Sequence, residues 1–84
     1  MTQELSSTLQ DYLETIRRLQ KEKRFARVRD IAQDLGVVKS AVSTALRSLA
    51  EKELVYYETY EPVTLTERGD EIAEQLYFRY RVIH

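Results

Sequence analysis

Apolar side chains recur at helical spacing near the start of the chain. In the stretch "LQDYLETIRRL" they fall on one face of a 3.6-residue period: Leu9, Tyr12, Leu13, Ile16 and Leu19. A helix with such a stripe buries one face and leaves the other in water. Ser7, with Gln10 three residues later, predicts a capping box, and we expect the helix to run to about Lys21.

Two shorter patterns of the same kind follow. The segment "VRDIAQDL" has four apolar positions at helical spacing: Val28, Ile31, Ala32 and Leu35. Gly36 comes next, and glycine is common in the left-handed conformation that ends a helix. After "GVVK", Ser40 predicts the cap of a third helix, because serine favours the N-cap position. The positions of this helix that we expect to point inward are Val42, Ala45, Leu46 and Leu49.

The second half of the chain begins with a change in residue type. β-branched and aromatic residues dominate "LVYYETYEPVTLT", and "ETYEP" interrupts the run. The pattern therefore predicts a hairpin formed by residues 54–58 and 62–66. Thr66 predicts the cap of a last helix, whose apolar side carries Ile72, Leu76 and Ile83.

The order of these elements predicts a winged helix-turn-helix fold, mainly α with a small β-hairpin and followed by a longer C-terminal helix. We expect residues 1–66 to form the winged helix-turn-helix domain and residues 67–84 to form the start of a dimerisation region. The segment "YFRYRVI" is aromatic enough to pack against a second copy or against more chain. Packing into the core explains part of the set Tyr77, Phe78 and Tyr80 equally well.

The net charge of −1 conceals an uneven distribution of charges. Residues 1–15 have a net charge of −3 and residues 53–84 a net charge of −4. Residues 16–52 carry ten Lys or Arg against four Asp or Glu, a net charge of +6. Such a basic middle favours a face turned toward a polyanion, although a mixed solvated surface gives the same counts.

The third predicted helix has the residue types of a DNA-recognition helix on its outward face. A helix that enters the major groove needs small side chains near its start, hydroxyls for hydrogen bonds, and an arginine for a phosphate or a guanine. Arg27 and Arg29, at the start of the preceding helix, are placed to contact the phosphate backbone. The other residues that we expect to contact DNA are Lys39, Ser40, Ser43, Thr44 and Arg47.

Composition excludes several classes of protein. A chain of 84 residues without cysteine has neither disulfide bonds nor thiolate metal sites. The N-terminal "MTQELSST" lacks the basic and apolar regions of a secretion signal, and no stretch approaches the length of a membrane span. We therefore expect a cytoplasmic protein with no membrane partner. An enzyme is disfavoured, because the sequence has no nucleophile–base arrangement, no glycine-rich phosphate loop and too little chain to enclose a pocket.

The sequence resembles the diphtheria-toxin-repressor family of metal-dependent transcriptional repressors, and within it the manganese-transport-regulator branch. The resemblance covers nearly all of residues 9–84. It rests on the order and spacing of "DYLETI", "ARVRDIAQDLGV", "SAVSTALRSL", "LVYYETYEPVTLTERG" and "QLYFRYRVI". It implies a sequence-specific repressor that binds a palindromic double-stranded DNA operator as a homodimer when a divalent metal is present. This chain resembles the DNA-binding domain and the first part of the dimerisation domain.

The resemblance also implies metal ligands on the first helix. In the manganese branch an aspartate and a glutamate three residues apart bind the metal, and they match Asp11 and Glu14. Mn²⁺ fits better than Fe²⁺, because a hard cation prefers carboxylate oxygens and the iron branch has a thioether at the matching position. The family has a histidine ligand in the fourth helix where this chain has Tyr80, and the single histidine, His84, lies one turn later. His84 is the third candidate ligand.

Two alternatives remain open on the residues alone. Glu14 and Arg18 are four residues apart in the favourable order, so Glu14 also fits a plain surface ion pair. With Tyr80 in place of histidine, the isolated chain also fits a metal-independent winged-helix module that acts through dimerisation or protein contacts. DNA affinity without turnover would separate the repressor and the metal-independent module from a third hypothesis, an enzyme that uses Asp11 and Glu14 as an acid–base pair.

Overall fold

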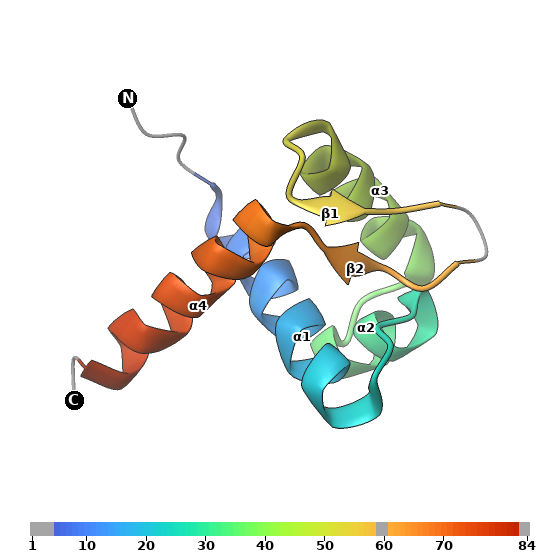
Figure 1. Cartoon of the computed structure of the whole chain (residues 1–84). Coiled ribbons are helices and arrows are strands. Elements are labelled where there is room, and N and C mark those ends of the chain that lie inside the picture. Colours follow the sequence, from blue (N-terminus) through green and yellow to red (C-terminus); the bar gives the residue numbers. More distant parts are fainter. Residues whose placement is uncertain (1–4, 59–60, 83–84) are drawn as a thin grey trace.

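The structure, a computed structural model, describes residues 5–58 and 61–82, with side chains described as far as residue 78. Figure 1 shows α1 in the middle of the molecule, with α2 and α3 on one side of it and α4 leaving on the other. The hairpin lies between α3 and the start of α4. The elements in chain order are α1 (Ser7–Lys23), α2 (Val28–Leu35), α3 (Lys39–Glu51), β1 (Val55–Tyr56), β2 (Thr64–Leu65) and α4 (Glu67–Val82).

The hydrophobic core forms where α1, α2, α3 and the hairpin meet. The largest fully buried side chains are Leu13, Ile16, Ile31, Val42, Leu46, Leu49 and Val63. Burying each of them contributes roughly 1.5–3 kcal/mol relative to exposure. The predicted inward face of α3 is confirmed, because all four of its predicted positions are buried. The last helix adds Ala73 and Leu76 to the buried set.

The ends of α1 differ from the prediction. The N-cap is Ser6, whose Oγ accepts a hydrogen bond from the Leu9 N–H at 3.2 Å. The predicted capping box of Ser7 and Gln10 is wrong, because the Gln10 amide donates to the Leu5 carbonyl instead. The helix also continues beyond Lys21 to Lys23. Lys21 and Lys23 lie in the last turn. Lysine is a good helix former and interacts favourably with the negative end of the helix dipole, so the helix continues beyond the last residue of its apolar stripe.

The turn between α2 and α3 confirms one predicted cap and corrects another. Gly36 is left-handed, with φ 69° and ψ 37°, and its N–H donates to the Ala32 carbonyl. Ser40, however, is not the cap of the third helix. The N-cap is Val38, whose carbonyl accepts from the N–H groups of Ala41 and Val42, and no side chain caps this end. Ser40 therefore lies inside the first turn of α3, where its side chain is exposed.

The hairpin lies where the sequence predicts it, but its strands are shorter than residues 54–58 and 62–66. The paired residues are Val55 with Leu65 and Tyr56 with Thr64. A single bridge joins Ala26 to Val63, through a 2.7 Å hydrogen bond from the Val63 N–H to the Ala26 carbonyl. This long-range pairing fixes the base of the hairpin to the segment before α2, and the arrangement is a winged helix.

The predicted cap at Thr66 is confirmed. Its Oγ1 accepts from the Gly69 N–H at 3.0 Å and donates to the Glu53 carbonyl at 2.9 Å. Thr66 therefore joins the first turn of α4 to the chain that precedes β1. Ile83 lies outside the described residues. Among the residues that are described, no helix is long and apolar enough to cross a membrane.

Candidate nucleic-acid interface and carboxylate site

The packing of α3 decides which of its residues face outward. Its buried stripe contacts α1 and α2, so the opposite side, with Ser40, Thr44 and Arg47, is exposed. The left-handed Gly36 turns the chain sharply between the two helices. Because the turn is short, α2 and α3 keep a fixed relation, as a helix-turn-helix requires.

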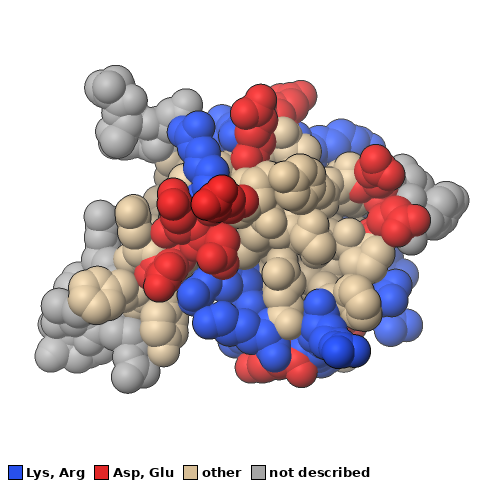
Figure 2. All heavy atoms as spheres, in the orientation of Figure 1, with Lys and Arg blue, Asp and Glu red and all other residues tan. Residues whose placement is uncertain are grey.

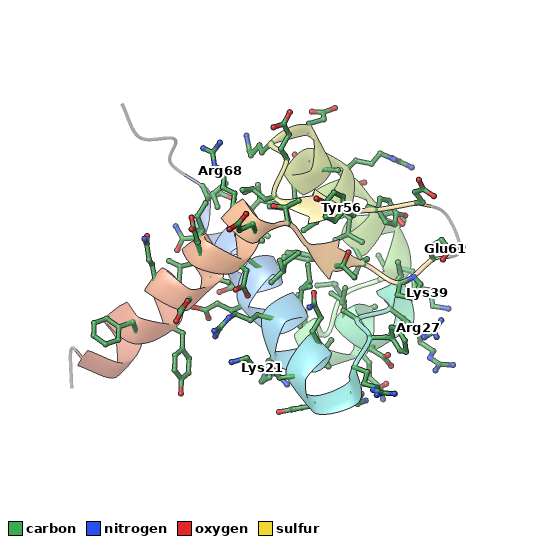
Figure 3. All side chains as sticks on the ribbon, viewed as in Figure 1. Lys21, Arg27, Lys39, Tyr56, Glu61 and Arg68 are labelled. Atoms are coloured by element: carbon green, nitrogen blue, oxygen red, sulfur yellow. The ribbon has the colours of Figure 1, made fainter. Side chains whose placement is uncertain are left out.

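The predicted DNA-contacting residues are exposed apart from Ser43, which is half-buried. Figure 3 shows Arg27 and Lys39 pointing outward at the same edge of the molecule. The Arg27 guanidinium lies over the Phe25 ring, 5.6 Å from its centroid, which limits the positions that this long side chain takes. Arg29 forms a loose ion pair with Asp30 at 3.9 Å. Such an exposed pair contributes little and leaves the guanidinium available to another anion.

Two hydroxyls on α3 already have partners within the protein. The Thr44 Oγ1 donates to the Ser40 carbonyl at 3.1 Å, so its proton is engaged and its lone pairs remain available. The Tyr57 hydroxyl, at the end of β1, donates to the Ser43 Oγ at 3.3 Å. Tyr57 is not among the residues predicted to contact DNA, because nothing in the local sequence pattern places this residue beside α3.

Charge is distributed unevenly over the surface. Figure 2 shows Lys and Arg gathered along the lower part of the face in view, over the end of α1 and over α2. Asp and Glu gather over the first turns of α4. The carboxylates over the first turns of α4 therefore lie on a different part of the surface from the basic residues over the end of α1 and over α2.

The two candidate metal ligands lie one turn apart on α1. Asp11 is exposed, whereas Glu14 is half-buried, and its Oε2 is buried without a hydrogen-bond partner. Burial raises the pKa of the Glu14 carboxyl, and the negative charge of Asp11 raises this pKa further. A buried anionic oxygen without a donor is unfavourable, and either a proton or a cation removes the cost. These two hard oxygen donors fit a divalent cation such as Mn²⁺.

Glu14 faces an open cleft of about 400 Å³ between α1 and α4. The lining residues are Glu14, Thr15, Arg17, Arg18, Lys21 and Glu22 from α1, and Ala73 and Tyr77 from α4. Arg17 crosses from α1 to α4, where its Nε donates to the Asp70 carboxylate at 3.2 Å. The cleft therefore lies where a ligand held by α1 would also meet the last helix.

The alternative ion pair between Glu14 and Arg18 is wrong. Arg18 instead donates to Asp34 in α2, and it also lies 3.6 Å from Glu22. Asp34 pairs with Arg18 although it lies sixteen positions later in the sequence, because the packing of α2 on α1 brings its carboxylate to the guanidinium. Glu14 is thereby left without this cation.

The third candidate ligand, His84, lies outside the described residues, as does the Tyr80 side chain. Within the described part of the chain, no group of three or more His, Asp or Glu residues comes together. A metal at Asp11 and Glu14 would therefore have two protein donors among the described residues, and its other ligands would have to come from water or from residues beyond these.

Residues 4–63 match the family described as "Iron dependent repressor, N-terminal DNA binding domain". The HTH-type transcriptional regulator MntR of Bacillus subtilis is 37% identical over 76 residues, which are 90% of this chain and 54% of that protein. MntR of Bacillus velezensis gives the same figures. The chain thus spans about half the length of these curated relatives, which are HTH-type transcriptional regulators.

Solved structures of winged-helix regulators superpose on this fold. Wild-type ZitR of Lactococcus lactis has a TM-score of 0.78 at 25% identity, over 96% of this chain and 54% of that one. A mutant of MepR from a multidrug-resistant clinical isolate of Staphylococcus aureus has a TM-score of 0.75 at 26% identity, over 87% and 55%. ZitR in complex with DNA has a TM-score of 0.73 at 24% identity, over 96% and 56%, and this likeness shows the fold alone.

The predicted resemblance is therefore confirmed from two sides, because the family match covers both helices of the helix-turn-helix and the MntR relatives cover most of the chain. The chain belongs to the iron-dependent repressor family, the diphtheria-toxin-repressor family of metal-dependent transcriptional repressors, with its N-terminal DNA-binding domain in residues 4–63 and a similarity to MntR that agrees with the manganese-transport-regulator branch.

Proposed function

We propose that this chain is the DNA-binding part of a repressor that binds its operator in response to a divalent metal, Mn²⁺ more readily than Fe²⁺. The observation that carries DNA binding is the exposed outer face of α3, fixed in direction by its fully buried inner face. The DNA complex of ZitR supports this use of the fold. The MntR relatives support the choice of metal.

In this proposal the predicted DNA-contacting residues have four kinds of role. Ser40 allows the start of α3 to approach the base edges closely, because its side chain is small. The Thr44 Oγ1 acts as an acceptor, since its proton is engaged with the Ser40 carbonyl. Arg47 forms no ion pair with any described residue and is the donor for a guanine or a phosphate. Arg27, Arg29 and Lys39 hold the phosphate backbone, and Ser43 contributes its remaining hydroxyl proton.

Asp11 and Glu14 would hold the metal, with His84 as a third ligand. The bound cation would neutralise the two carboxylates and satisfy the buried Glu14 oxygen. A metal regulates DNA binding only if it interacts differently with two arrangements of the protein. The position of Glu14 beside α4 supports such a difference, because α4 leads away from the DNA-binding part.

We also propose that the protein binds a palindromic operator as a homodimer, with residues 67–84 as the start of the dimerisation region. Tyr77 and Phe78 support this assignment, since they are 53% and 66% exposed on α4. Large apolar side chains at such exposure favour contact with another polypeptide. A two-fold dimer presents two recognition helices to two half-sites, which is why the operator would be palindromic.

The first experiment tests DNA binding itself. A library of random duplexes is selected on the chain, and affinity for the recovered sequence is compared with affinity for an unrelated duplex. Replacing Arg47 with Ala should cost roughly 1–3 kcal/mol on the recovered sequence if this residue reads a base. Arg68→Ala is the matched control, because Arg68 is exposed at the start of α4, on the opposite side of the molecule from Arg27 and Lys39 (Figure 3). Equal affinity for every duplex in wild type and variant would refute sequence-specific binding.

The second experiment tests the metal. Operator affinity and sedimentation mass are measured with Mn²⁺, with Fe²⁺ and with chelator, and Mn²⁺ binding to the protein alone is followed by calorimetry. Glu14→Gln and Asp11→Asn should abolish the response to Mn²⁺ and the calorimetric signal while leaving metal-free binding unchanged. Equal operator binding with and without metal would support the metal-independent winged-helix module instead.

A further inference from the structure

The loop of the hairpin carries charges of the opposite sign to its surroundings. Residues 56–63 include Glu58 and Glu61 and no Lys or Arg. Both glutamates are exposed, and neither forms an ion pair with any residue that the structure describes. Two uncompensated carboxylates therefore stand on the one element that follows directly after the recognition helix.

Backbone hydrogen bonds hold the two described ends of this loop. The Glu61 N–H donates to the Glu58 carbonyl at 3.1 Å, and the Val63 N–H donates to the Ala26 carbonyl at 2.7 Å. Because Arg27 follows Ala26 directly, the base of the loop is attached beside a predicted phosphate contact. Figure 3 shows Glu61 at the same edge of the molecule as Lys39 and Arg27.

We propose that Glu58 and Glu61 repel the phosphate backbone and weaken the affinity of this protein for DNA of any sequence. The inference rests on the proposed function, since it concerns the DNA bound by α3. Phosphate contacts dominate the affinity of any duplex, so a negative charge held at the DNA edge opposes binding independently of sequence. Unpaired charges of this kind are a general way to suppress unwanted association. Stable binding then requires DNA whose contacts with α3 outweigh the repulsion from Glu58 and Glu61.

The test is a double charge-neutralising variant, Glu58→Gln with Glu61→Gln. Both side chains are exposed and glutamine has nearly the same shape, so the fold is retained. The control is Glu51→Gln with Glu53→Gln, two exposed carboxylates at the end of α3 and in the turn that follows it. Binding to a random-sequence duplex and to the selected operator is measured by fluorescence anisotropy over a range of salt concentrations.

We expect the loop variant to bind the random duplex roughly 3- to 10-fold more tightly at about 50 mM salt, with a log–log salt slope steeper by about 1. Operator affinity should rise by a similar factor, and the control should stay within about twofold of wild type. Unchanged affinity and slope for the random duplex would overturn the inference. A loss of affinity confined to the operator would also overturn it, since the carboxylates would then be accepting hydrogen bonds from cytosine amino groups.

The two proposals fail in different ways. Wild-type protein that binds duplexes, with a loop variant of identical affinity and slope, refutes only the role of Glu58 and Glu61. Wild type and variant that both fail to bind any duplex refute the proposed function and this inference together.

Discussion

Gly69 lies directly against the backbone of Leu54, and replacing it with Ala should destabilise the protein. This residue lies in the first turn of α4 and is buried. A Cβ atom at this position would lie 2.0 Å from the Leu54 carbonyl oxygen, 2.9 Å from its carbon and 3.3 Å from the Leu54 Cα. All three atoms belong to the backbone, so no side-chain rotation relieves the clash.

The size of the destabilisation depends on how far the Leu54 backbone has to move to accommodate the Cβ atom. The Leu54 carbonyl accepts a hydrogen bond from the Thr66 N–H at 3.0 Å, and a shift of about an ångström would break this bond, at a cost of about 0.5–1.5 kcal/mol. Forcing an extra carbon into a packed site costs typically 1–3 kcal/mol and sometimes more. The better helix propensity of Ala returns at most about 1 kcal/mol. The free energy of unfolding should therefore fall by roughly 1–4 kcal/mol, which is a Tm lower by roughly 5–30 °C for a domain of this size.

Urea and thermal unfolding, followed by circular dichroism, measure this change. Gly36→Ala is the matched control, because its Cβ would meet nothing within 4 Å and only the left-handed backbone, with φ 69°, opposes it. That substitution should cost about 1–2 kcal/mol. An effect of Gly69→Ala below about 1 kcal/mol would refute the reasoning.

Two further predictions concern Glu14 and Thr66. Because burial and then Asp11 raise the pKa of Glu14 in the folded state, the stability linked to its protonated form is complete below the unfolded pKa, near 4, and is lost as pH rises through the folded pKa. The Tm of metal-free Glu14→Gln relative to wild type should therefore increase as pH rises above the unfolded pKa, and a Tm difference that does not change with pH would contradict this. Thr66→Val should lower the free energy of urea unfolding by about 1–2 kcal/mol, since it removes the cap on Gly69 and the bond to the Glu53 carbonyl. Thr64→Val, on an exposed position of β2, should change it by less than about 0.5 kcal/mol, and equal effects of the two variants would refute the capping role.

The candidate site was partly predictable, and the division follows the range of the interactions. The exposed face of α3 can be predicted from its apolar stripe. The stripe packs against the core, so the opposite side of the helix faces solvent. The pair Asp11 and Glu14 is also local, since residues three apart on a helix are neighbours. The partner of Arg18 was not predictable. Asp34 reaches it only because α2 packs on α1, and that packing leaves Glu14 without the expected cation.

The sequence by itself determined the type and order of the helices, the hairpin and the left-handed turn at Gly36. These features depend on hydrogen bonds and apolar spacing within a few residues of one another, which the chain carries in its local pattern. Tertiary structure alone decided the burial of Glu14, the contact between Tyr57 and Ser43, the bridge from Ala26 to Val63 and the closeness of Gly69 to Leu54. Each of these features depends on residues from separate elements, which come together only when the elements pack. The periodic pattern of a single segment carries no information about such a contact.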